Sequence, residues 1–132
     1  MTPIASNEVR LVARLDTAGL VFPIAVDPAW GPANKMGIPR YETYLVRLPS
    51  GAAFVTGGRS QTVPYIASTE TFDPSTRTWT VRAPMKTARG RHGMAVLSDG
   101  RVMVTGGAAG SFLTSCEIYD PATDTWTDAA PL

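Results

Sequence analysis

Few side chains in this sequence of 132 residues are of the types that carry out covalent or metal chemistry. The chain has one histidine, His92, and one cysteine, Cys116. A metal centre based on histidine needs several converging ligands, so a single chain of this protein does not supply one. One cysteine also excludes an internal disulfide and a zinc site built from several thiolates. We therefore predict neither a bound metal nor a cofactor.

Short catalytic motifs do not occur either. The sequence has no P-loop, no GxSxG elbow and no HExxH stretch. The segments "TGGRS" from Thr56 and "TGGAAG" from Thr105 contain glycine pairs, but neither precedes a helical pattern or a P-loop lysine. These observations predict that the chain is not an enzyme.

Two carboxylates stand at matching places, Glu70 in "ETFDPSTRTWT" and Glu117 in "EIYDPATDTWT". A catalytic acid or base would be a unique carboxylate, whereas these two recur 47 residues apart. We predict that each is a structural hydrogen-bond acceptor, paired with one of the equally repeated Arg40 and Arg89. If such a pair is buried, breaking it from one side costs roughly 3–5 kcal/mol.

The repetition extends over two long units. Residues from Met36 to Gly58 match residues 49 positions later, and the stretch from Glu70 matches one 47 positions later. The two-residue difference falls in one connection, "RSQTVPYIAST" in the first unit and "AAGSFLTSC" in the second. Variation confined to one loop is typical of a structural repeat.

Each unit has the pattern of four short strands. In the second unit they are "RHGMAVL", "RVMVTGG", "SCEIYD" and "TWTDAAP". Asp99-Gly100 predicts a hairpin between the first two strands, because glycine accepts the positive φ of a tight turn. "DPST" and "DPAT" fit type I turns. The glycine pair that ends the second strand predicts a close approach by another backbone or an aromatic ring.

Four strands in a unit of about 50 residues are typical of a propeller blade. Each unit has a Gly-Gly pair, then an aromatic residue, then six residues and a tryptophan. These positions are Gly57, Gly58, Phe72 and Trp79 in the first unit and Gly106, Gly107, Tyr119 and Trp126 in the second. The pattern resembles the kelch repeat, and "MKTARGRHGMAVLSDGRVMVTGG" is also similar to galactose-oxidase-type propellers. The resemblance implies an all-β fold with two four-stranded antiparallel kelch-type blades in an incomplete ring.

We expect three segments. Residues 36–84 form the first kelch unit and residues 85–132 the second. Residues 1–35 do not repeat, and "RLVARLDTAGLVFPIAV" predicts a β-hairpin that is the end of a preceding β-domain or part of a blade. Trp30 either takes the place of the last-strand tryptophan of a missing blade or is an ordinary tryptophan at the end of a domain.

Two blades and a hairpin do not close a ring, since propellers use about four to eight blades. An open blade face carrying Val, Met, Leu and Trp favours association. We therefore expect either further blades in a longer protein or copies of this chain that assemble.

Charge and hydropathy argue against some partners and indicate the cellular location. The net charge is +1 and the arginines do not cluster, which argues against nucleic acid. No apolar stretch reaches the length that a membrane span needs. The N-terminus lacks a signal-peptide pattern, so the chain as written is expected in the cytoplasm, or at the cell surface if it is part of a larger protein.

Candidate contacts with a protein or glycan lie in the variable loops, because loops on a rigid scaffold commonly carry recognition. They are Arg59, Gln61, Tyr65 and Phe112 in the loops, with Arg82 and Lys86 near the links between units. His92 replaces Thr43 of the first unit, and we interpret it as a first-strand residue near the propeller axis, with a ligand contact as the alternative. Cys116 is predicted to be a half-buried free thiol.

Two functions remain open. The first is a non-catalytic interaction module, the commonest role of kelch propellers. The second is a fragment of a galactose-oxidase-like enzyme. Resemblance to that family implies copper held by two tyrosines and two histidines with a Tyr–Cys crosslink. With one histidine, and with Cys116 outside any such arrangement, we expect this chain to lack the copper site.

Overall fold

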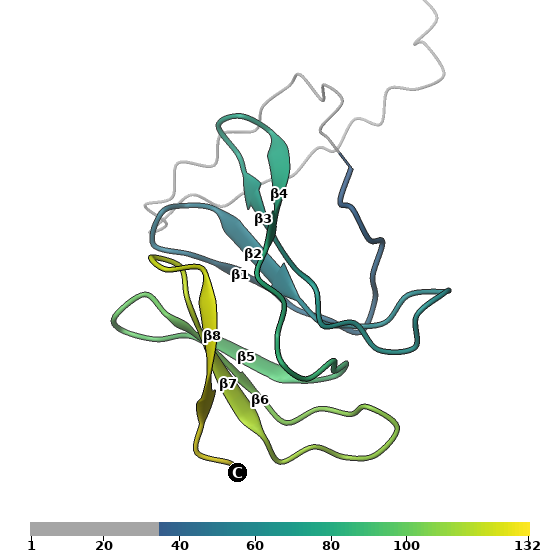
Figure 1. Cartoon of the computed structure of the whole chain (residues 1–132). Coiled ribbons are helices and arrows are strands. Elements are labelled where there is room, and N and C mark those ends of the chain that lie inside the picture. Colours follow the sequence, from purple (N-terminus) through teal and green to yellow (C-terminus); the bar gives the residue numbers. More distant parts are fainter. Residues whose placement is uncertain (1–34) are drawn as a thin grey trace, which may run out of the picture. The chain divides into compact units, whose positions relative to one another are not determined.

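The computed structural model describes residues 35–132 of the chain (Figure 1). The described residues belong to one compact unit of the chain. The predicted N-terminal hairpin and Trp30 lie outside the described residues. All regular elements of the described part are strands, and it contains no helix able to cross a membrane. The predicted all-β fold class is confirmed.

Eight strands form two four-stranded antiparallel sheets, which we call blade 1 and blade 2. Blade 1 consists of β1 (Leu45–Arg47), β2 (Ala53–Thr56), β3 (Thr69–Asp73) and β4 (Thr78–Arg82). Blade 2 consists of β5 (Gly93–Val96), β6 (Val102–Thr105), β7 (Cys116–Asp120) and β8 (Thr125–Ala129). In both blades, strands that are consecutive in the sequence are neighbours in the sheet. The exact unit limits of 36–84 and 85–132 stay predictions.

The strand register places the repeated residues at equivalent positions. In blade 1 it pairs Phe72 with Trp79, and in blade 2 it pairs Tyr119 with Trp126. Side chains alternate between the two sides of a strand, so Glu117 lies on the same side of β7 as Tyr119.

The hairpin between β5 and β6 is a type I turn closed by a glycine. The Gly100 N–H donates to the carbonyl oxygen of Leu97 at 2.9 Å, and Gly100 has a φ of 88°. A type I turn followed by a left-handed residue is a common short hairpin, and glycine adopts that conformation without strain. Gly51 in blade 1 repeats the geometry with a φ of 91°. The Asp-Gly prediction is confirmed.

The glycine pairs that follow β2 and β6 lie where backbones meet. A Cβ on Gly57 would lie 2.6 Å from the carbonyl oxygen of Arg89, and a Cβ on Gly107 would lie 2.6 Å from that of Gly90. Real Cβ atoms do not approach an oxygen so closely, and both glycines also have positive φ. The predicted close approach is therefore made by backbone carbonyls.

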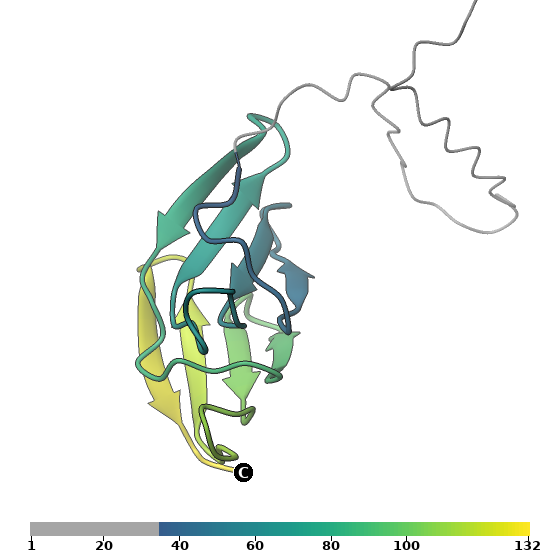
Figure 2. The ribbon, with the colours of Figure 1, turned by 90° about the vertical axis from the view of Figure 1, so that its right-hand side faces the viewer.

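The two blades stack on each other (Figure 2). An aromatic cluster lies between them. The ring of Phe54 in β2 lies 4.9 Å from that of Tyr119 and 6.3 Å from that of Trp126, measured between centroids. The other members of the core are apolar: Leu48, Met85, Val102 and Val104. Hydrophobic burial between the sheets thus stabilises their stacking.

Candidate functional site

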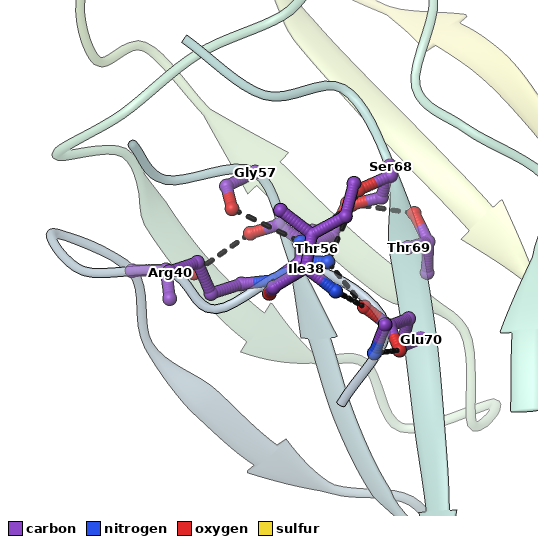
Figure 3. Close-up of polar contacts among 9 residues, drawn as sticks. Ile38, Arg40, Thr56, Gly57, Ser68, Thr69 and Glu70 are labelled. Atoms are coloured by element: carbon purple, nitrogen blue, oxygen red, sulfur yellow. Dashed lines mark hydrogen bonds and ion pairs between the residues drawn. The ribbon is translucent and has the colours of Figure 1, made fainter. Parts of the chain in front are cut away.

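A buried ion pair connects the link that precedes blade 1 to its third strand (Figure 3). Nη2 of Arg40 lies 2.6 Å from Oε1 of Glu70, and both side chains are almost fully buried. The carboxylate of Glu70 also accepts from the backbone N–H groups of Gly37 and Ile38. Nη1 of Arg40 donates to the carbonyl oxygens of Gly57 and Ser68. The pair therefore fixes the link against the ends of β2 and β3.

Blade 2 repeats this arrangement. Nη2 of Arg89 lies 2.9 Å from Oε1 of Glu117, whose carboxylate also accepts from the N–H groups of Lys86 and Thr87. Nη1 of Arg89 donates to carbonyl oxygens at the ends of β6 and β7. The predicted pairing of the repeated arginines and glutamates is confirmed. Buried charges that are paired and hydrogen-bonded in this way hold a chain segment in place.

His92 lies at the junction of the two blades, directly before β5. Its side chain is buried beside Gly57 and Gly107. Neither ring nitrogen has a hydrogen-bond partner among the described residues. Burial, reinforced by the positive charge of Arg89, lowers the pKa of His92 from 6.5 to about 4. The imidazole is therefore neutral near pH 7.

The structure corrects the predicted exposure of Cys116. We predicted a half-buried thiol, whereas the structure buries it almost completely. Cys116 begins β7, an inner strand of blade 2, and it is paired with Thr105 on one side and Ala129 on the other. Its thiol points to the carbonyl oxygen of Thr114, with a sulfur–oxygen distance of 3.8 Å. This environment gives the thiol no access to a reaction partner.

One arginine and two tyrosines form a partly exposed cluster beside the loop that follows β2. The guanidinium carbon of Arg59 lies 5.4 Å from the ring centroid of Tyr65 and 5.9 Å from that of Tyr41. These distances allow cation–π attraction to both rings. Nε of Arg59 donates to the carbonyl oxygen of Pro64, and its Nη1 lies 3.5 Å from Oε2 of Glu42. We call Tyr41, Arg59 and Tyr65 the arginine–tyrosine cluster.

A cleft of about 550 Å³ adjoins this cluster. It lies between the link that precedes blade 1 and the loop after β2. Its lining residues are Gly37, Ile38, Pro39, Arg40, Tyr41, Ser60, Gln61, Thr62 and Val63. Gln61, at the edge of the cleft, is exposed to solvent.

The remaining candidate contacts do not join the arginine–tyrosine cluster. Nε of Arg82 donates to Oγ1 of Thr71 in its own blade, and Lys86 forms an exposed ion pair with Asp128 at 2.7 Å. Phe112 in the β6–β7 loop is 95 % exposed. The structure therefore brings together Arg59 and Tyr65 near Gln61. The other three candidates, Arg82, Lys86 and Phe112, lie apart from this cluster.

Sequence reasoning missed Tyr41 as a partner of Arg59. Tyr41 belongs to the link before blade 1, and only the fold brings it next to the loop, where it forms a β-bridge with Arg59. A signal was present, because the corresponding position in the second unit is Gly90. An aromatic residue that fails to repeat is not needed by the blade framework.

Comparison with known proteins identifies the blades. Residues 88–132 match the family model of the kelch motif. The chain carries a kelch repeat. Blade 1 has the same strand order and the same buried pair, so the kelch resemblance predicted from sequence is confirmed. No curated protein matches the chain.

One similar solved structure is described as a novel fungal alcohol oxidase with catalytic diversity among the AA5 family, in complex with copper. It has a TM-score of 0.57 and is 30 % identical to the kelch chain, over 67 % of this chain. The match covers 18 % of the oxidase, so the kelch chain spans about a fifth of that protein's length. This similarity supports a kelch propeller fragment related to the galactose-oxidase-like propellers.

The described residues do not fit a copper centre. They contain no group of three or more His, Cys, Asp or Glu side chains able to hold a metal ion. His92 is buried between blades, and Cys116 is directed at a backbone carbonyl. A metal site needs several donors that converge on one point, and this part of the chain does not provide them.

Proposed function

We propose that this chain is a non-catalytic kelch propeller fragment that binds a protein or a glycan through its variable loops. The observation that carries the proposal is the arginine–tyrosine cluster beside the cleft. Tyrosine and arginine are the residue types that dominate binding energy at protein interfaces, since each combines a large contact area with hydrogen-bonding groups. Two members of the cluster, Arg59 and Tyr65, lie in the loop whose length differs between the blades.

The cluster is held in place before any partner arrives. Arg59 is fixed by Pro64, by Glu42 and by two aromatic rings, although about a third of its side chain stays exposed. A side chain that is already ordered loses less conformational entropy on binding. The neighbouring Gln61 offers both a donor and an acceptor. A partner rich in hydrogen-bonding groups, such as a peptide backbone or a sugar, matches these properties.

A binding selection tests the proposal on the full chain. Ligands would be selected from a displayed peptide library and from a glycan array, and their affinities measured by calorimetry. We expect Arg59→Ala to weaken the selected ligands by about tenfold or more, as truncation of a central interface residue commonly does. Arg101→Ala is the matched control, because Arg101 is also exposed but pairs with Asp99 in the β5–β6 hairpin. Equal affinities for the two variants would contradict the proposal.

A second candidate function rests on the similarity to the copper alcohol oxidase. The chain would then be a fragment of a galactose-oxidase-like enzyme that lacks its copper site. Metal analysis of the purified chain, together with an alcohol oxidase assay on galactose and simple primary alcohols, tests whether the chain is non-catalytic. Stoichiometric copper with turnover would contradict both the non-catalytic function and the absence of the copper site.

A further inference from the structure

The interface between the blades is made from two unlike faces. Blade 1 contributes the side of β2 that carries Phe54, which we call a forward face. Blade 2 contributes the side that carries Tyr119 and Trp126, which we call a rear face. Because the blades repeat, each has one face of each kind. One rear face and one forward face are therefore not used in this contact.

The unused rear face belongs to blade 1, and it is already arranged like the used one. The rings of Phe72 and Trp79 lie 5.2 Å apart at 45°, and those of Tyr119 and Trp126 lie 5.2 Å apart at 47°. Tyr119 and Trp126 are buried, whereas Phe72 and Trp79 are only partly covered. Leu45 on the same face is 57 % exposed.

The unused forward face belongs to blade 2, and it is apolar at the corresponding positions. Met103 occupies the place of Phe54, and its cross-strand partner Ile118 occupies the place of the buried Thr71. Met103 and Ile118 are only partly buried. Methionine is flexible and fills irregular apolar gaps, so Met103 is suited to pack against an aromatic pair, as Phe54 does in the internal interface.

The residues that follow blade 2 also take the conformation of an interblade link. The N–H of Leu132 donates to the carbonyl oxygen of Thr114 at 2.9 Å, as the N–H of Met85 donates to that of Ala67 at 2.9 Å. Leu132 lies against Gly106, as Met85 lies against Gly57. Yet Leu132 is 78 % exposed, whereas Met85 is 3 % exposed because blade 2 covers it.

We propose that the forward face of blade 2 docks on the rear face of blade 1 in a second copy of this chain. Met103 of one copy then lies against Phe72 and Trp79 of the next, as Phe54 lies against Tyr119 and Trp126. The second copy is the fitting occupant because the contact continues an interface that this same chain already forms. Such a head-to-tail contact closes into a ring where the rotation permits. With the two blades of the described residues in each copy, a propeller of about four to eight blades takes about two to four copies.

Analytical ultracentrifugation of the full chain across the micromolar range tests this assembly. We expect the mass to rise to a multiple of one chain. Leu45→Glu damages only the rear face and Ile118→Glu only the forward face, so each variant alone is expected to be monomeric. Mixed in equal amounts, they still offer one intact face of each kind and are expected to form a one-to-one dimer. Leu132→Glu, at an exposed position, replaces Ile118→Glu if circular dichroism shows that the latter is unfolded.

Val81→Asp is the matched control on the same rear face. Val81 is 72 % exposed, and its counterpart in blade 2 is Asp128, which stays exposed in the internal interface. Association is therefore expected to survive Val81→Asp. A wild-type chain that stays monomeric, a mixture that gives no dimer, or a loss of association in Val81→Asp as large as in Leu45→Glu would each overturn the proposal.

Discussion

Trp126 donates its indole N–H to the carbonyl oxygen of Ala83 at 2.7 Å, so the outermost strand of blade 2 is tied to the link that leaves blade 1. The same link is fixed from another side, because the N–H of Ala83 donates to Oδ1 of Asp124 at 3.0 Å. Asp124 also accepts from the hydroxyl of Tyr119 at 2.6 Å. The signature residues of the kelch unit thus join successive blades as well as the strands within one blade.

This relationship predicts unequal effects for the two tryptophans. Trp126→Ala removes a buried ring and a hydrogen bond at the blade junction, and we expect the free energy of unfolding to fall by roughly 3–5 kcal/mol. Trp79→Ala should cost less, because Trp79 is only partly covered by the described residues. Urea titrations followed by circular dichroism, at concentrations where the chain is monomeric, give both values. Equal losses of unfolding free energy would contradict the explanation that burial at the blade junction makes Trp126 the more important of the two.

The buried ion pairs predict a large penalty for removing one partner. Glu117→Gln leaves the buried guanidinium of Arg89 without its counter-charge, so we expect the free energy of unfolding to fall by roughly 3–5 kcal/mol. Asp128→Asn is the matched control, since Asp128 pairs with Lys86 at the surface, where ion pairs contribute little. Urea titration of both variants gives the comparison. A control variant as unstable as Glu117→Gln would contradict this account.

The repeated residues made most of the fold predictable from sequence. Arg40, Arg89 and their glutamates recur at fixed spacing, and a framework that repeats must use them in the same way each time. The different exposure of Trp79 and Trp126 was not predictable, because it depends on which face of each blade is covered. The contact between Tyr41 and Arg59 was missed for a related reason. It forms between a link and a loop that only the folded chain brings together.

Two glycines of blade 2 have almost the same backbone conformation but different surroundings. Comparing them measures how much steric contact contributes to stability at the glycine pair Gly106-Gly107. Gly107 has a φ of 91° and Gly110 a φ of 89°. Alanine in a left-handed conformation costs roughly 1–2 kcal/mol at either site. A Cβ at Gly107 would also meet the carbonyl oxygen of Gly90 at 2.6 Å, whereas nothing lies within 4 Å of one at Gly110. We expect Gly107→Ala to lower the melting temperature clearly more than Gly110→Ala, and equal shifts would contradict the steric explanation.

Because His92 is buried in its neutral form, we expect the free energy of unfolding to fall in mild acid. Its pKa is 6.5 in an open environment and about 4 in the folded chain, because burial and the charge of Arg89 oppose protonation. Between these two values the unfolded chain binds more protons, so the free energy of unfolding falls as the pH decreases. At 1.36 kcal/mol per pKa unit, the contribution of His92 to this loss reaches about 3 kcal/mol near pH 4.

The variant His92→Thr isolates this contribution from the carboxylates that titrate in the same range. Threonine is the residue at the corresponding place in blade 1, where Oγ1 of Thr43 donates to the carbonyl oxygen of Thr56 at 2.7 Å. It carries no titratable group, so the stability of the variant should depend less on pH between 6.5 and 4 than that of the wild type. Urea titrations of both proteins at several pH values in this window measure the difference. Parallel pH profiles would show that the imidazole of His92 is not buried in its neutral form.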